Sequence, residues 1–306
     1  MKPHPDLSLL QEVALETGIT EAFVEKDWFV VQVIAAIHGI DHRGFEVVFS
    51  GGTALSKAHG LLQRFSEDVD FRLRVPESMG TRRILSGYKR AVIEVLRQQG
   101  FAIDDANVRA RDENRFFAVE LDYESLISRP DSLRPHIQLE FTAREPQMPP
   151  LYKSVASFIS TLTRTPPEIA NIACIDPVES AADKLSALCW RIPDRRRGDP
   201  DDDPAIIRHV HDLALLQAQA LANSRFPSLV LEVLKQDEQR PRNTKFSIGL
   251  SAVDKFHNML TQLENDADYT VEYDRFVRGV SYAPEGVTPS FNEAIALLKN
   301  LIMLFE

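Results

Sequence analysis

The segment FEVVFSGGTALSKAHG, residues 45–60, constrains the fold of this chain more than any other stretch. An apolar run typical of a buried strand leads into two adjacent glycines, and a helix-compatible segment containing Lys57 follows. Glycines permit tight strand-to-helix turns, and the backbone N–H groups of such turns can bind phosphates. The segment therefore predicts mixed α and β structure around a candidate phosphate-binding turn.

This turn matches neither of two well-known phosphate-binding motifs. A P-loop reads G-x-x-x-x-G-K-[ST]. Here Ser56 stands in place of the second glycine, and Ala58 replaces the hydroxyl residue that would bind Mg²⁺. The dinucleotide fingerprint G-x-G-x-x-G also fails, because Gly51 and Gly52 are adjacent. Taken alone, the turn is equally compatible with a purely structural role.

The segment RFSEDVDF, residues 64–71, gives the turn a chemical context. Asp68 and Asp70 are two residues apart at the start of a predicted strand, so their carboxylates point to one face. Neighbouring carboxylates repel each other unless a cation lies between them. Mg²⁺, or Mn²⁺ in its place, takes oxygen ligands and usually keeps substrate phosphates in its shell. A phosphate cradle beside such an acid pair is what metal-assisted nucleotidyl transfer from an NTP requires.

A third acid is expected from a neighbouring strand. In HIQLEFTA, residues 136–143, Glu140 alternates with apolar neighbours and therefore lies on the polar face. Glu120 and Asp122 in the preceding segment AVELDY are the alternatives. The pattern favours Glu140 and leaves this choice open.

Several motifs, in order, resemble one protein family. EKDW within 20–39, then GGTALSK, then RFSEDVDF are similar to the AbiEii/AbiGii (MenT-like) nucleotidyltransferase toxins, within the superfamily of DNA polymerase beta. ESAADKLSAL (179–188), IIRHVHDLALL (206–216) and VTPSFNEAIALL (287–298) resemble its later motifs. The resemblance implies the toxin of a type IV-like toxin–antitoxin or abortive-infection system in phage defence. It further implies an adjacently encoded antitoxin and the 3′ end of tRNA as acceptor.

The resemblance also assigns roles to individual residues. The implied nucleotide-binding set is Gly51, Gly52, Thr53, Lys57 and Ser66, and Ser66 is also a candidate for covalent modification. The catalytic set is Asp68, Asp70, Lys184 and Asp212, with Glu140 added from its strand pattern, and Asp68 and Asp70 are the metal ligands. One position departs from the family. His209 stands where many members carry an aspartate, so that role is either lost or carried by Asp212.

Hydrophobic periodicity predicts an α+β chain in two parts. Residues 1–160 are predicted to form a helical segment followed by a nucleotidyltransferase-type mixed sheet flanked by helices. Residues 161–306 predict a mainly helical domain that contributes Lys184 and Asp212 to the site. The predicted strands are 45–49, 69–75, 115–123 and 136–143, and the predicted helices are 20–39, 53–62, 81–99, 177–191, 204–220, 226–236, 250–265 and 289–305. Residues 268–277 fit helix or strand.

Composition restricts the classes of partner that the chain is expected to bind. A net charge of −10 counts mildly against a dedicated nucleic-acid-binding module, although basic residues cluster at 82–83, 89–90 and 195–197 and are candidate RNA contacts. No apolar run reaches the roughly 18 residues of a membrane span, so a cytoplasmic protein without membrane contact is expected. Two alternatives stay open: nucleotidyl transfer to a protein or small molecule, and a non-catalytic nucleotide-binding partner protein, which His209 motivates.

Overall fold

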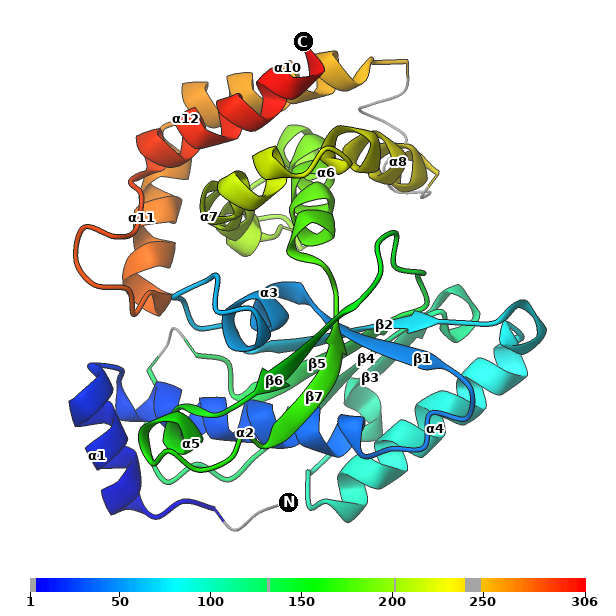
Figure 1. Cartoon of the computed structure of the whole chain (residues 1–306), viewed down its shortest axis with the longest axis vertical. Coiled ribbons are helices and arrows are strands. Elements are labelled where there is room, and N and C mark those ends of the chain that lie inside the picture. Colours follow the sequence, from blue (N-terminus) through cyan, green and yellow to red (C-terminus); the bar gives the residue numbers. More distant parts are fainter. Residues whose placement is uncertain (1–3, 131–132, 201, 240–248) are drawn as a thin grey trace. The chain divides into compact units, whose positions relative to one another are not determined.

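The computed structural model of the chain describes residues 4–130, 133–200, 202–239 and 249–306. The chain divides into two compact units, Met1–Ile175 and Asp176–Glu306. The first unit contains a mixed sheet with helices, and the described part of the second unit is helical (Figure 1). The α+β class predicted from the sequence is therefore confirmed.

One sheet organises the first unit. Within the described residues it has seven strands in the order β3-β4-β5-β2-β1-β7-β6. The strands are β1 (Glu46–Ser50), β2 (Asp68–Arg74), β3 (Val108–Arg111), β4 (Phe116–Asp122), β5 (His136–Thr142), β6 (Leu151–Val155) and β7 (Ile169–Cys174). β2 pairs antiparallel with β1 and parallel with β5. The acid-bearing strand thus lies at the centre of the sheet.

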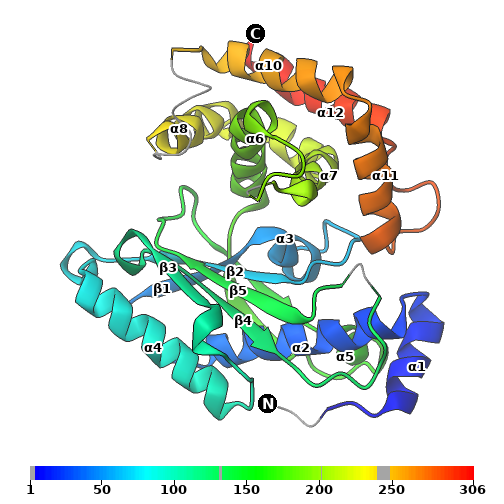
Figure 2. The same cartoon turned by 180° about the vertical axis from the view of Figure 1, so that it is seen from behind.

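The two faces of this sheet differ in character. The helices of the first unit are α1 (Leu7–Thr17), α2 (Glu21–His38), α3 (Gly51–Thr53), α4 (Arg82–Gln98) and α5 (Phe158–Leu162). Both views place α2 and α4 on one face and α3 on the other (Figures 1 and 2). The face toward α4 is apolar, and the Tyr88 ring lies 6.5 Å from Phe117 and 6.0 Å from Phe141. The other face carries the acids.

The predicted helix 53–62 takes a different form. It begins as one short helical turn, α3, and continues as a π-helical segment, Ala54–Ala58. Such wide turns are rare and are frequently found at functional sites. The segment directly follows β1, so the strand-to-helix turn predicted around the two glycines is present.

Several elements of the first unit carry too little pattern to be predicted. β3 and β6 are edge strands whose side chains are mostly exposed, so they lack the apolar alternation that marks half-buried strands. β7 pairs parallel with β1 and extends the sheet to Cys174. For this reason the two units separate after Ile175, whereas the expected division after residue 160 falls inside α5. α1 is also absent from the prediction.

The second unit packs its helices around α6 and α7. Its described helices are α6 (Pro177–Asp194), α7 (Arg208–Ala222), α8 (Phe226–Glu238), α10 (Ala252–Asn265), α11 (Asp268–Val280) and α12 (Phe291–Ile302). Leu185 and Leu188 of α6 and Leu213 of α7 are fully buried. The ambiguous segment 268–277 is helical, as part of α11. In the described ranges, none of the helices combines the length and the apolarity that crossing a membrane would demand.

Candidate active site

The acids predicted on β2 share the polar face with the predicted third acid. Asp68 and Asp70 alternate with the buried Val69, and both are partly exposed. The parallel pairing of β2 with β5 places Glu140 directly beside Asp70 and Gln138 beside Asp68. Glu120 lies one strand further out, opposite Gln138, and its carboxylate contacts Arg109 at 3.1 Å. Of the candidate third acids, Glu140 is therefore the neighbour of Asp70.

Gly51 lies directly against Asp70. Its backbone has φ +76°, in the left-handed region, and a Cβ built on it would lie 1.9 Å from the Asp70 Oδ2. Ser50, the last residue of β1, is also paired with Asp70 across the sheet. Only glycine meets both the conformational and the steric requirement, so the glycine turn and the acid pair form one compact arrangement.

Gly52, Thr53 and Ser66 hold the same turn together. A Cβ on Gly52 would lie 2.7 Å from Arg64 Nη2 and 3.0 Å from Ser66 Oγ. The Thr53 hydroxyl is buried and donates to the backbone carbonyl of Asp68. The side chain of Thr53 thus positions Asp68 and does not point to a ligand, which leaves its backbone N–H as the group for the predicted phosphate contact.

Lys57 has a different partner from the one expected. Its Nζ lies 2.5 Å from Asp27 Oδ1 and 3.9 Å from the centre of the Phe158 ring, and its side chain is only 9% exposed. Burial raises the pKa of Asp27, whereas the Lys57 charge and the Phe158 N–H, at 2.8 Å, oppose that shift. The ammonium of Lys57 is therefore engaged in a buried ion pair, which argues against the direct phosphate contact predicted for it.

Asp27 belongs to a run of three buried charges in α2, each with its own partner segment. Glu25 accepts from the N–H of Leu126 at 2.7 Å, and Lys26 pairs with Glu67. Burial lowers the pKa of Lys26, and the charge of Glu67 opposes the shift. The EKD motif thus connects α2 to segments that surround the site.

Arg134 is a site residue that the sequence analysis does not identify. Its Nη1 lies 2.6 Å from Asp68 Oδ1. Arg134 precedes β5 as Glu67 precedes β2, and because these strands are parallel their entry segments meet. A cation two residues before the predicted strand 136–143 is its one local signal, and only the parallel pairing of β5 with β2 brings that cation to Asp68.

Two predicted residues of the second unit also come together. Lys184 of α6 and Asp212 of α7 form a buried ion pair at 2.8 Å. His209 lies one turn before Asp212, and burial, together with the charges of Lys184 and nearby arginines, holds its pKa well below the usual range. The imidazole of His209 is therefore neutral at pH 7.

The basic clusters differ in whether their side chains are engaged in ion pairs within the protein. Arg195 contacts Glu272 at 2.5 Å, and Arg197 contacts Glu272 at 2.7 Å and Asp266 at 2.5 Å. These arginines attach their loop to α11, which argues against the predicted role in RNA binding. In contrast, Arg82, Lys89 and Arg111 line a cavity of about 340 Å³ in the first unit. Arg82 and Lys89 form no ion pair with a described residue.

The donor set of the acid face suits a divalent cation. Within the described ranges, no three His, Cys, Asp or Glu side chains already form a metal site. Asp68 and Asp70 offer hard oxygen ligands on one face, and the Arg134 guanidinium shows that a cation can occupy that position. Two carboxylates completed by substrate phosphates are a usual set for Mg²⁺, so these residues fit the predicted ion.

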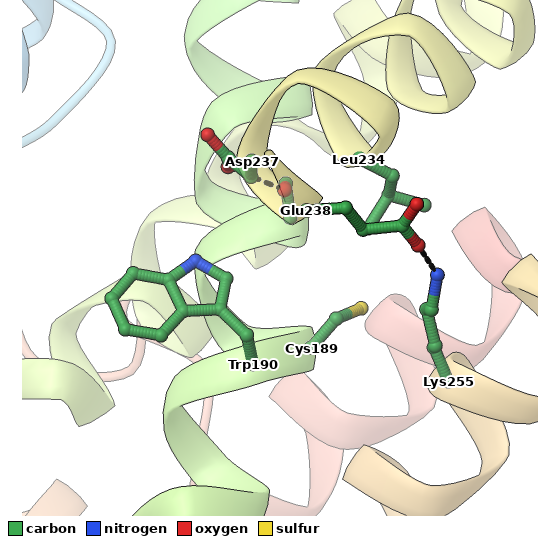
Figure 3. Close-up of a pocket in the computed structure, with 7 residues that line it drawn as sticks. Cys189, Trp190, Leu234, Asp237, Glu238 and Lys255 are labelled. Carbon is green, nitrogen blue, oxygen red and sulfur yellow. Dashed lines mark hydrogen bonds and ion pairs between the residues drawn. The ribbon is translucent and has the colours of Figure 1, made fainter. Parts of the chain in front are cut away.

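A small cavity in the second unit is an alternative candidate for the nucleotide-binding site. It measures about 10 Å³ and is lined by residues of α6, α8 and α10, among them Cys189, Trp190 and Lys255 (Figure 3). Lys255 pairs with Glu238 across it. A volume of this size holds about one water molecule, so the cavity cannot accept a nucleotide.

Comparison with known proteins gives one family. A family model described as "Nucleotidyl transferase AbiEii toxin, Type IV TA system" matches residues 40–297. Among solved structures, the chain is similar to the MenT4 nucleotidyltransferase toxin of Mycobacterium tuberculosis, with 16% identity, a TM-score of 0.48 and coverage of 97% of this chain and 99% of that one. An antigenic nucleotidyltransferase-like protein from Paracoccidioides brasiliensis shows 15% identity, a TM-score of 0.36 and coverage of 68% and 88%. No curated protein matches the sequence.

Proposed function

Because this chain belongs to the AbiEii family of nucleotidyltransferase toxins of type IV toxin–antitoxin systems, we propose that it transfers a nucleoside monophosphate from an NTP to RNA, at the 3′ end of a tRNA. The acceptor hydroxyl attacks the α-phosphorus, the bond between the α- and β-phosphates breaks, and pyrophosphate leaves. The observation that carries the proposal is the contact between Gly51 and Asp70, which joins a phosphate-type turn to an acid pair. Inhibition by an antitoxin encoded nearby follows from the same family membership.

The residues of the acid face divide the chemistry among them. Asp68 and Asp70 would hold Mg²⁺ or Mn²⁺, and a divalent ion bound there would offset phosphate charge and lower the pKa of the attacking hydroxyl. Glu140, beside Asp70, accepts the proton of that hydroxyl as general base. The N–H groups of the Gly51–Thr53 turn bind the phosphates of the NTP.

The pair in the second unit adds no independent support. Lys184 is held by Asp212 in a buried ion pair, as Lys57 is held by Asp27, so the phosphate contact of Lys184 is proposed from the family resemblance alone. In this account Asp212 takes over the function of the missing family aspartate, because the neutral His209 cannot supply a negative charge.

An RNA acceptor is supported by one cation, Arg111, of the basic cavity of the first unit. Arg111 pairs with Phe116 of β4, which pairs with Thr142 of β5, which pairs with Arg72 of β2. Paired residues share a face, so Arg111 lies on the face that carries Asp70. Arg82 and Lys89 come from α4 on the opposite face, so of the three cations Arg111 alone is placed to favour the phosphodiester backbone of a polynucleotide beside the acids.

The acceptor is tested with labelled nucleotides. The protein is incubated with each of the four α-³²P-labelled NTPs, Mg²⁺ and total tRNA, either intact or periodate-oxidised at its 3′ diol. We expect label on intact tRNA and none on oxidised tRNA. Label on protein alone, or on a small molecule, would replace the tRNA proposal with the corresponding transferase. Nucleotide binding without any transfer would support the non-catalytic alternative that His209 raises.

A further inference from the structure

The backbone of Arg134 is held on one side by the partly exposed Glu67 and on the other by the buried Lys26. Its N–H donates to Glu67 Oε2 at 3.0 Å, and its carbonyl accepts from the Lys26 ammonium at 2.7 Å. Lys26 is fully buried and also pairs with Glu67. The position of Arg134 is thus determined by α2 and by the residue that directly precedes Asp68.

From this fixed backbone, the guanidinium of Arg134 extends to the acid face. Besides its contact with Asp68 Oδ1, at 2.6 Å, its Nε lies 3.6 Å from Glu67 Oε1. The Arg134 side chain is 42% exposed, whereas that of Asp68 is 15% exposed. One edge of the guanidinium therefore covers a carboxylate while the remainder faces solvent.

This arrangement has two consequences for the proposed reaction. A cation that binds Asp68 must compete with the guanidinium for the charge of that carboxylate. Once displaced, the guanidinium keeps its charge and five donors within one side-chain length of Asp68, where phosphate oxygens arrive with the metal. Of the other cations near the turn, Lys57 is held by Asp27, and the Arg64 guanidinium lies against Gly52.

We propose that Arg134 is the counter-ion of Asp68 until the metal and the NTP bind, and that it then becomes a phosphate-binding residue for the NTP. The inference rests on the proposed function, because it takes the NTP and its metal as ligands of the acid face. It assigns to Arg134 the phosphate contact that the sequence suggests for Lys57.

The test separates metal binding from nucleotide binding. Mn²⁺ binding without nucleotide is followed by electron paramagnetic resonance, and NTP binding with Mg²⁺ but without acceptor by calorimetry. In Arg134→Gln we expect about threefold to fivefold tighter Mn²⁺ binding, because an ion-pair competitor is gone. The same variant should bind NTP roughly ten- to a hundredfold more weakly, because charge-assisted hydrogen bonds are lost.

Two further variants define the controls. Arg134→Lys keeps the charge and loses the planar fork, so Mn²⁺ affinity should stay near wild type while NTP binding is still weakened. Arg74→Gln removes a cation from the far end of β2, where Arg74 pairs with Glu46 and Glu145, and should change neither affinity. Unchanged Mn²⁺ affinity, or unchanged NTP affinity, in folded Arg134→Gln would overturn the proposal. Both readouts need no turnover, so they stay informative if the wild type transfers nothing.

Discussion

Gly51 has a structural and a chemical role at once. Its positive φ lets the chain turn out of β1, and its missing side chain lets the backbone lie against Asp70. Gly60 shares the positive φ, at +65°, but a Cβ there would meet nothing within 4 Å. A comparison of the two positions therefore separates the cost of a left-handed backbone from the cost of a side chain that would clash with Asp70.

Substitution by alanine should have unequal effects at these glycines. Gly60→Ala pays only for the left-handed backbone, about 1 kcal/mol. Gly51→Ala adds a clash with a carboxylate and should cost about 3 kcal/mol or more, together with the transfer activity. Thermal unfolding and the transfer assay measure both. Equal losses of stability in the two variants would show that the contact with Asp70 is unimportant.

Some residues of the candidate site can be predicted from local sequence patterns, and others cannot. Asp68, Asp70 and Glu140 could be placed on one face because alternation in a strand is a local rule, and register then set Glu140 beside Asp70. The partner of Lys57 could not be predicted, since Asp27 lies on a helix far away in the sequence. Long-range ion pairs leave no local pattern.

At the level of elements, α2 acts as the support of the site. The Lys26 ammonium is buried between Glu67 and the carbonyl of Arg134, so it joins the entry segments of β2 and β5. The two acids and the guanidinium opposite them depend on this connection. The helix itself was predictable from its apolar residues, but its buried charges were not assigned partners.

Replacing Lys26 should therefore be costly. Lys26→Met leaves Glu67 without its buried partner, and we expect a loss of about 3–5 kcal/mol of stability. Lys299→Met is the matched control, because Lys299 contacts Glu264 at 2.5 Å on an exposed surface and its loss should cost about 1 kcal/mol or less. Urea denaturation of both variants measures the difference. Similar small losses would mean that the buried pair contributes little.

Edge strands mark the limit of element prediction. The central strands β2, β4 and β5 alternate and were predicted, whereas β3 and β6 carry mostly exposed side chains and were not. An edge strand with solvated side chains has the composition of a loop. The hydrophobic pattern therefore predicts too few strands, and it ends the first unit before the last strands of the sheet.

At the scale of the whole molecule, His209 gives the second unit a defined pH response. In the folded protein the pKa of His209 is depressed, so below its unfolded value of about 6.5 the unfolded state binds more protons. The stability contributed by neutral His209 is thus present above pH 6.5 and is lost as the pH falls toward the folded pKa, by about 1.4 kcal/mol per pH unit.

Tryptophan fluorescence can follow the pH dependence of the stability of the second unit by itself. The chain has two tryptophans, and in a Trp28→Phe background Trp190 reports on the second unit. Urea unfolding between pH 5 and 8 should show the slope with His209 and a flatter profile in His209→Gln. Identical slopes in the two proteins would assign the response to other groups.

The central claim is that the carboxylates of one sheet face perform nucleotidyl transfer, and single-turnover transfer of α-³²P label to tRNA tests it most directly. We predict that Asp70→Asn lowers the rate about a thousandfold or more, and Glu140→Gln about a hundredfold. Glu120→Gln, one strand further out and paired with Arg109, should stay within a few-fold of wild type. Wild-type rates in Asp70→Asn, or a larger loss in Glu120→Gln than in Glu140→Gln, would contradict the account.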